Sequence, residues 1–260
     1  TVYELVRQGD VLQDGITTVG SFISSSGFIN SAGEVAFAAN ITQASFGGQA
    51  VILADDIGTA VVAKGVLPGF TSAATNMAVV GISNSGRVAF TADTVAGGSD
   101  PTSAIYLTGP GGPTTVALED TATPVPGKYI RGFLSGATVA NDAGQVAFMA
   151  DLSDTVNGAS TGRGVFFYDQ AGGLQQIART GDSLLGSTIT NAFFFGMVNA
   201  SANMSPDTSA TGLNNVGQVG FSFSLANGTN GMAIWSVPTH VPGGYTGNRT
   251  VDPSHCVLWR

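Results

Sequence analysis

An eight-residue pattern that recurs four times constrains this chain more than any other feature of its sequence. Each copy has a polar residue first, glycine fourth and phenylalanine eighth. The copies lie at residues 30–37, 83–90, 141–148 and 214–221. A glycine at this place suits a tight turn with one positive φ, and the β-branched and aromatic residues after it favour a strand. Each copy therefore predicts a hairpin.

Two short apolar segments, bounded by turn residues, follow the repeats and predict a third and a fourth strand. The third strands are expected at residues 50–54, 104–107, 164–168 and 231–237, and the fourth strands at 59–64, 114–119 and 174–179. The last repeat has no fourth segment at its C-terminal end. Residues 1–7, followed by Gly9-Asp10, are in register with the segment that ends at Arg179 and precedes Gly181-Asp182. The missing strand is thus predicted at the N-terminus.

This permutation favours an all-β fold, a closed β-propeller of four blades whose last blade is completed by the N-terminal strand. A linear array has no reason to begin in the middle of a unit, whereas a ring closed by its first and last segments has one. Residues 35–39 and 146–150 are apolar at both parities, as expected for sheets covered on both faces. A β-solenoid or a large barrel is the alternative. We expect one domain over residues 1–237 and an irregular tail over 238–260.

The unit N-x-x-G-x-V-A-F, followed by a short strand and an R-x-G-D-like turn, resembles bacterial exported proteins with tandem NxxGxxAF repeats. The resemblance covers about residues 1–237. It implies export and a repeated architecture, with a variable C-terminal anchor, but no catalytic residues. The tail after Val237 departs from the pattern of that family.

Charge and composition disfavour nucleic acid as a partner and indicate where the protein is located. The formal net charge of −8 and the absence of a Lys/Arg cluster disfavour nucleic acid. No apolar run approaches the ~20 residues needed to span a bilayer. Low lysine content, abundant Ser, Thr, Gly and Asn, and an acidic pI are typical of exported bacterial β proteins, so a secreted or cell-surface monomer is expected.

Histidine and cysteine are confined to the tail, which holds His240, His255 and Cys256. A Ser-His-Asp triad or a histidine zinc site would require this tail to fold back over the repeats. Adjacent His255 and Cys256 would point to opposite faces of a strand, which disfavours a nucleophile pair. No catalytic residue is predicted.

Oxygen ligands recur three residues after each repeat phenylalanine, at Asn40, Asp93, Asp151 and Ser224. Hard cations such as calcium bind several oxygen atoms of this kind, so Asp93, Asp151 and Asn40 are candidate metal ligands. The loops 93–100 and 151–157 are expected to share one face with the residues that follow the fourth strands. Asp and Asn also cap strand ends as solvated turn residues, and that structural interpretation is favoured.

The fourth repeat is the longest, and its extra residues at 198–211 lead into an inner strand. The best candidates for contact with a ligand in this insertion are Asn199, Asn203, Asp207 and Thr208. The phenylalanines 193–195 are expected in the core rather than on a stacking platform. The repeat residues Asn30, Asn141 and Asn214 are expected to bond the turn backbone rather than to form a polar ring in a central channel.

Two hypotheses about function follow. The first is an extracellular, non-catalytic propeller that binds or displays a glycan, a surface polymer or a small molecule. The alternative is a hydrolase of small esters, lactones or phosphotriesters that uses a calcium-like ion on the loop face of the propeller. The second rests on analogy with other propellers alone.

Overall fold

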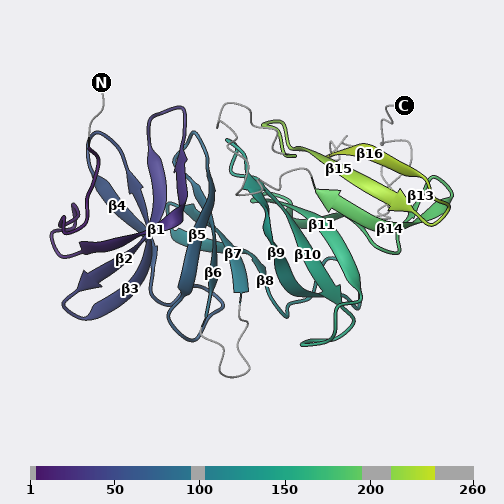
Figure 1. The fold of residues 1–260 in the computed structure, drawn as a ribbon, viewed down its shortest axis with the longest axis horizontal. Coiled ribbons are helices and arrows are strands. Elements are labelled where there is room, and N and C mark those ends of the chain that lie inside the picture. The colour runs from purple at the N-terminus through teal and green to yellow at the C-terminus, as the bar shows by residue number, and fades with distance from the viewer. Residues whose placement is uncertain (1–3, 95–102, 195–211, 238–260) are drawn as a thin grey trace. The chain divides into compact units, whose positions relative to one another are not determined.

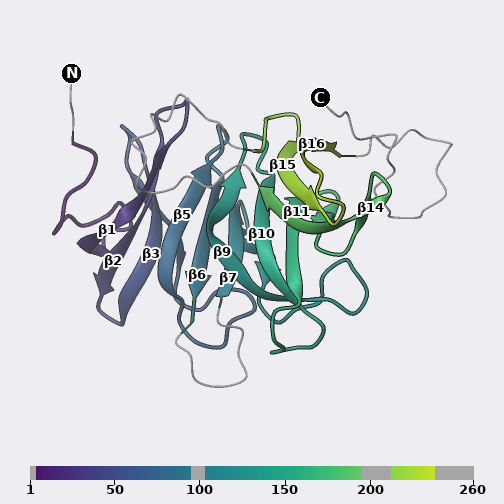
Figure 2. The same ribbon diagram turned by 45° about the vertical axis from the view of Figure 1, so that its right-hand side comes forward.

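The protein is built from antiparallel β-sheets, and a computed structural model describes residues 4–94, 103–194 and 212–237. In the first sheet the strands are β1 (Thr18–Ile29), β2 (Val35–Gln43), β3 (Phe46–Ala54) and β4 (Thr59–Lys64). The second sheet contains β5 (Thr75–Ile82), β6 (Val88–Asp93), β7 (Ser103–Gly109) and β8 (Gly112–Leu118). Within each sheet, consecutive strands are hydrogen-bonded neighbours (Figures 1 and 2).

The C-terminal half repeats this arrangement. The third sheet contains β9 (Tyr129–Ala140), β10 (Val146–Ser153), β11 (Gly162–Asp169) and β12 (Gly173–Arg179). The fourth contains β13 (Ser183–Leu184), β14 (Ser187–Phe194), β15 (Gln218–Leu225) and β16 (Asn230–Ser236). The described chain has no helix, and so none that could cross a membrane. The all-β prediction is confirmed, and β3, β7, β11 and β16 stand where third strands were expected.

The repeat turns form through bonds within a few residues. In the first copy, Asn30 Oδ1 accepts the backbone N–H groups of Ala32 and Glu34, both at 3.0 Å. The glycine at the fourth position of each copy has a positive φ, which is 84° at Gly33. In the second copy, Ser83 stands in for asparagine and its Oγ accepts the backbone N–H of Arg87 at 3.0 Å. The expected structural role of the repeat asparagine is confirmed.

The chain folds into two compact units, each built around two sheets. Unit 1 comprises residues 1–121 and 140–144, and unit 2 comprises residues 122–139 and 145–260. In unit 1, small side chains of β2, such as Ala36 and Ala38, pack against Phe90 and Tyr106 of the second sheet. Alanine at these places lets the two sheets approach closely, which explains its alternation with large residues.

The core of unit 2 lies between the third and fourth sheets. Met149, Val165 and Phe167 face Phe221 and Phe223 in one cluster of buried side chains. Burial on β10 is nearly continuous, but on β15 it alternates strictly. The expectation of coverage on both faces therefore holds at residues 35–39 and 146–150, whereas β15 is covered on one face in the described structure.

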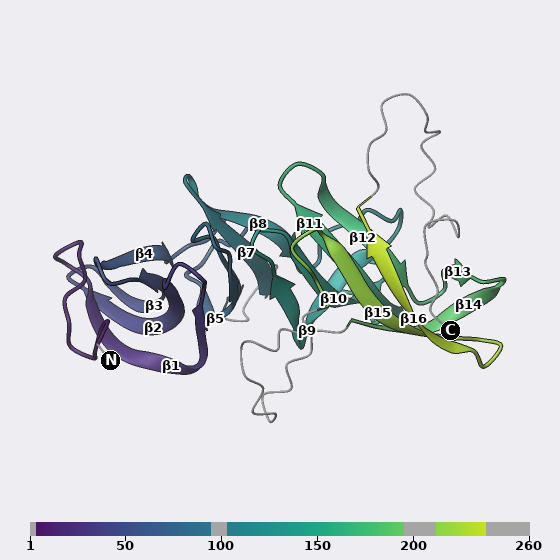
Figure 3. The same ribbon diagram turned by 90° about the horizontal axis from the view of Figure 1, so that it is seen from above.

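The predicted strand over residues 1–7 is corrected by the structure. Residues 4–7 form no strand, and β16 is hydrogen-bonded to β15 as the last strand of its sheet (Figure 3). The fourth place in that sheet is taken at the opposite edge by the short strand β13. Leu5 and Val6 instead pack against the outer core of the first sheet, where their apolar side chains are shielded from water.

The register that suggested the permutation is nevertheless correct. The backbone N–H of Arg7 donates to Asp10 Oδ2 at 2.9 Å, and that of Arg179 donates to Asp182 Oδ2 at 3.0 Å. In each turn a glycine N–H also donates to a carbonyl of the next strand, as Gly181 does to Ile189 at 2.8 Å. The sequence identifies equivalent turns correctly but does not predict what precedes the first of them.

Candidate polar site in unit 2

Asn199, Asn203, Asp207 and Thr208, the residues expected to contact a ligand, lie outside the described residues. Of the phenylalanines 193–195, Phe194 is buried, as expected of a core residue, whereas Phe193 is 39% exposed. These two consecutive strand residues point to opposite faces of the fourth sheet, and among the described residues only one of these faces is covered. Phe195 lies outside the described residues.

The candidate metal ligands each bond within their own sheet. Asn40 Nδ2 donates to Ser21 Oγ at 2.9 Å across β1 and β2. Asp93 Oδ1 accepts the hydroxyl of Ser103 at 2.7 Å. Asp151 pairs with Arg163 across β10 and β11, with 2.9 Å between Oδ1 and Nε. In the described part of the chain, no three His, Cys, Asp or Glu side chains are grouped to hold a metal ion.

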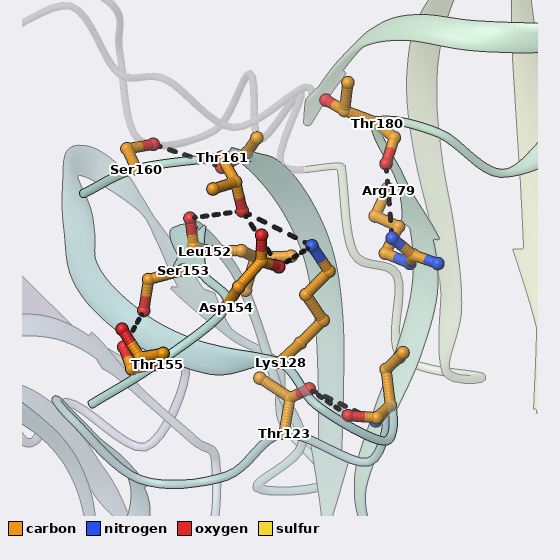
Figure 4. A network of polar contacts seen from close by, with 12 residues as sticks. Thr123, Lys128, Leu152, Ser153, Asp154, Thr155, Ser160, Thr161, Arg179 and Thr180 are labelled. Atoms are coloured by element: carbon orange, nitrogen blue, oxygen red, sulfur yellow. Dashed lines mark hydrogen bonds and ion pairs between the residues drawn. The ribbon is translucent and has the colours of Figure 1, made fainter. Parts of the chain in front are cut away.

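A different set of polar side chains converges at one end of the third sheet (Figure 4). Lys128 directly precedes β9, Asp154 directly follows β10, and Thr161 directly precedes β11. The Lys128 ammonium pairs with Asp154 Oδ1 and donates to Thr161 Oγ1 at 3.3 Å. We call these three residues the Lys128 cluster.

Local turns hold the Lys128 cluster in place. The N–H of Thr123 donates to the carbonyl of Lys128 at 2.8 Å, and the Thr123 hydroxyl accepts the N–H of Val125 at 3.1 Å. The N–H of Thr161 donates to the carbonyl of Leu152 at 2.7 Å, which fixes the entry into β11. Lys128 and Thr161 therefore extend from hydrogen-bonded turns rather than from unrestrained loops.

Charge keeps the carboxylate ionised. The hydrogen bond from Lys128 lowers the pKa of Asp154, and the positive charge of Arg179 at the end of β12 lowers it further. The Asp154 side chain is 59% exposed, and that of Lys128 is 20% exposed. The cluster therefore presents an exposed anionic acceptor beside a partly exposed cationic donor.

A second ion pair lies at the same end of the sheet. Arg179 Nε is 3.1 Å from Asp182 Oδ1, and Gln176 Nε2 donates to Asp182 Oδ2 at 3.0 Å. Burial raises the pKa of Asp182, although the charge of Arg179 opposes that rise. Gln176 Oε1 is buried without a partner in the described structure.

Within the third sheet the loop 151–157 and the end of β12 lie at the same end, as expected, since Arg179 lies close enough to Asp154 to lower its pKa (Figure 4). Most of the loop 93–100 lies outside the described residues. Lys128 and Thr161 were not singled out from sequence. One signal was available for Lys128, because the chain has two lysines in total. Thr161 carried no signal, since threonine is common in this chain and its role depends on a partner far away in sequence.

The sequence model of a family of unknown function (DUF7453) matches residues 1–242. No curated protein matches the chain. Among solved structures, a triple arginine-to-alanine mutant of AofleA from Arthrobotrys oligospora is similar over 85% of this chain and 57% of its own length. The two share 11% sequence identity with a TM-score of 0.33.

Proposed function

The chain belongs to this family of unknown function (DUF7453). We propose that it is a non-catalytic binding module for a polyhydroxylated ligand, which is a glycan or a hydroxyl-rich surface polymer. The observation that carries the proposal is the Lys128 cluster, where an exposed carboxylate, an ammonium group and a hydroxyl meet at one sheet end. In keeping with the exported repeat proteins that the sequence resembles, we place the module outside the cell.

The chemistry of the Lys128 cluster suits hydroxyl groups. A sugar hydroxyl donates one hydrogen bond and accepts others, so a neighbouring pair of hydroxyls can donate to Asp154 and accept from Lys128. Charged partners make such bonds about twice as strong as neutral ones. Because the two protein charges cancel, a neutral ligand does not leave an unpaired charge behind on binding.

The side chains around the cluster favour binding over catalysis. Residues 4–237 contain no histidine or cysteine, so the repeats supply no imidazole base or thiol nucleophile. The Ser153 hydroxyl donates to the carbonyl of Thr155 at 2.7 Å rather than to a general base. The calcium-dependent hydrolase is the weaker alternative, because Asn40, Asp93 and Asp151 already bond to neighbouring side chains.

Isothermal titration with neutral hexasaccharides of xylose, glucose and N-acetylglucosamine tests the proposal. We expect Lys128→Ala and Asp154→Ala each to weaken binding at this cluster tenfold or more, since a hydrogen bond to a charged group contributes about 1.5–3 kcal/mol. Asp56→Ala, which removes an exposed carboxylate in the turn after β3, is the matched control and should bind normally.

Two results would contradict the binding proposal. One is the absence of binding to every hexasaccharide and to the corresponding long polymers. The other is hydrolysis of small esters, lactones or phosphotriesters that a chelator abolishes, which would favour the metal-dependent alternative.

We further propose that the four sheets are blades of one closed propeller. The recurrence of four-stranded antiparallel sheets in chain order supports it. Small-angle X-ray scattering checks the proposal. A single compact ring of this length should have a radius of gyration of about 18 Å. A clearly larger value with two separated maxima in the distance distribution would contradict closure.

A further inference from the structure

Both lysines of the chain lie in polar clusters at sheet ends, one in each unit. In unit 2 this is the Lys128 cluster. In unit 1, Lys64 Nζ donates to Gln43 Oε1 at 2.9 Å. The Gln43 amide donates in turn to Thr17 Oγ1 and lies 3.5 Å from Asp14 Oδ2. We call these four residues the Lys64 cluster.

The two clusters occupy equivalent places in their repeats. Gln43 and Asp154 each stand six residues after the repeat phenylalanine, where the second strand ends. Thr17 and Lys128 each directly precede the first strand of their sheet. The cation at the end of the fourth strand is Lys64 in the first sheet and Arg179 in the third. The repeat therefore brings the same three element ends together twice.

A related contact, to the first residue of β14, occurs without a cation in the fourth sheet. Asn227 stands six residues after the repeat phenylalanine, and its backbone N–H donates to Ser187 Oγ at 3.3 Å. Since this copy holds the sheet end with a neutral serine and a backbone group, closing the sheet end does not require a charged side chain. The ammonium and carboxylate groups of the other two copies therefore call for a further role.

Asp14 gives the Lys64 cluster its exposed acceptor. Its Oδ1 accepts the N–H groups of Ile16 at 3.0 Å and Thr17 at 2.8 Å, and its Oδ2 accepts the Thr17 hydroxyl at 2.5 Å. These bonds, led by the Thr17 hydroxyl, lower the pKa of Asp14, and the charge of Lys64 contributes. As in unit 2, an ionised and exposed carboxylate lies near an ammonium group.

We propose that the Lys64 cluster is a second binding site for the same class of hydroxyl-rich ligand, so that one chain binds two ligand segments. This inference rests on the proposed function of the Lys128 cluster. The neutral amide of Gln43 takes the place that Asp154 holds in unit 2, which leaves one carboxylate, at Asp14, to accept from the ligand. The two sites therefore share a ligand class but differ in affinity.

Titration of the full chain with the neutral hexasaccharide that binds most tightly tests the proposal. We expect two hexasaccharides per chain for the unaltered protein. Lys64→Met and Lys128→Met keep the apolar stem and remove the ammonium group, and each should weaken binding at its own cluster tenfold or more while the other cluster keeps its affinity. The double variant should weaken binding at both clusters. Asp56→Met is the control, at an exposed position that belongs to neither cluster.

Hydrogen exchange provides a second measurement that does not depend on the folding of a variant. In the unaltered protein, saturating ligand should slow amide exchange at residues 14–17 and 41–45 as well as at 126–130 and 152–161. One ligand per chain, with protection confined to the segments of unit 2, would overturn the second site and leave the proposed function standing. No binding by the unaltered chain would overturn the proposed function itself.

Discussion

Replacing Asn30 with alanine should destabilise unit 1 by about 2–3 kcal/mol. The asparagine makes two bonds to backbone N–H groups within its own turn. Its amide also donates to the carbonyl of Ser83 at 2.8 Å and to Glu34 Oε2 at 2.6 Å. Each such bond contributes about 1 kcal/mol net, and since the side chain is only half-buried, water replaces part of the loss.

The chain itself offers the matched control, because Ser83 occupies the equivalent place in the second repeat. Its Oγ retains one backbone bond, from the N–H of Arg87. Asn30→Ser should therefore keep the corresponding bond to Glu34 while losing the contacts that the longer amide makes. We expect this variant to lose about 1–2 kcal/mol, which is about 1 kcal/mol less than the loss for alanine.

Urea unfolding followed by circular dichroism measures the two variants against the unaltered chain. The midpoint should fall in the order unaltered chain, Asn30→Ser, Asn30→Ala, with an unchanged dependence on urea concentration, since the surface exposed on unfolding is the same. If the two variants lose equal stability, or if alanine loses less than about 0.5 kcal/mol, the side-chain bonds do not hold the turn.

Three further predictions follow from the packing, the buried charge and the tail. Gly231→Ala should destabilise by about 1–3 kcal/mol, because the added Cβ would lie 2.5 Å from Phe223 Cζ, whereas Gly47→Ala has no neighbour within 4 Å and should be tolerated in urea unfolding. Because the raised pKa of Asp182 gives stability that is lost as pH rises through it, Asp182→Asn should gain stability relative to the unaltered chain between pH 3 and pH 7. An equal difference at both pH values would contradict that sign. Removing residues 239–260 should leave thermal stability and ligand binding unchanged, and a loss of either would show that the tail is part of the working molecule.

Sequence alone determined the turns and the strands that depend on them. The bonds of Asn30 to Ala32 and Glu34 span two and four residues, so the information lies inside one copy of the repeat. The same holds for the turn in which Arg179 donates to Asp182, three residues on. Local bonds of this kind are written into a short pattern, which is why equivalent strands and turns were predicted in the correct register.

Tertiary structure decided which surfaces are covered and which loops meet. Leu5 and Val6 were predicted to lie in a strand, but their side chains pack against the buried apolar residues of the first sheet. Lys128 meets Asp154 and Thr161 across 26 and 33 residues of chain, and no repeat position distinguishes this lysine in advance. Such contacts depend on how whole sheets turn and pack, and the free energy of that packing is shared among many distant residues rather than held in one motif.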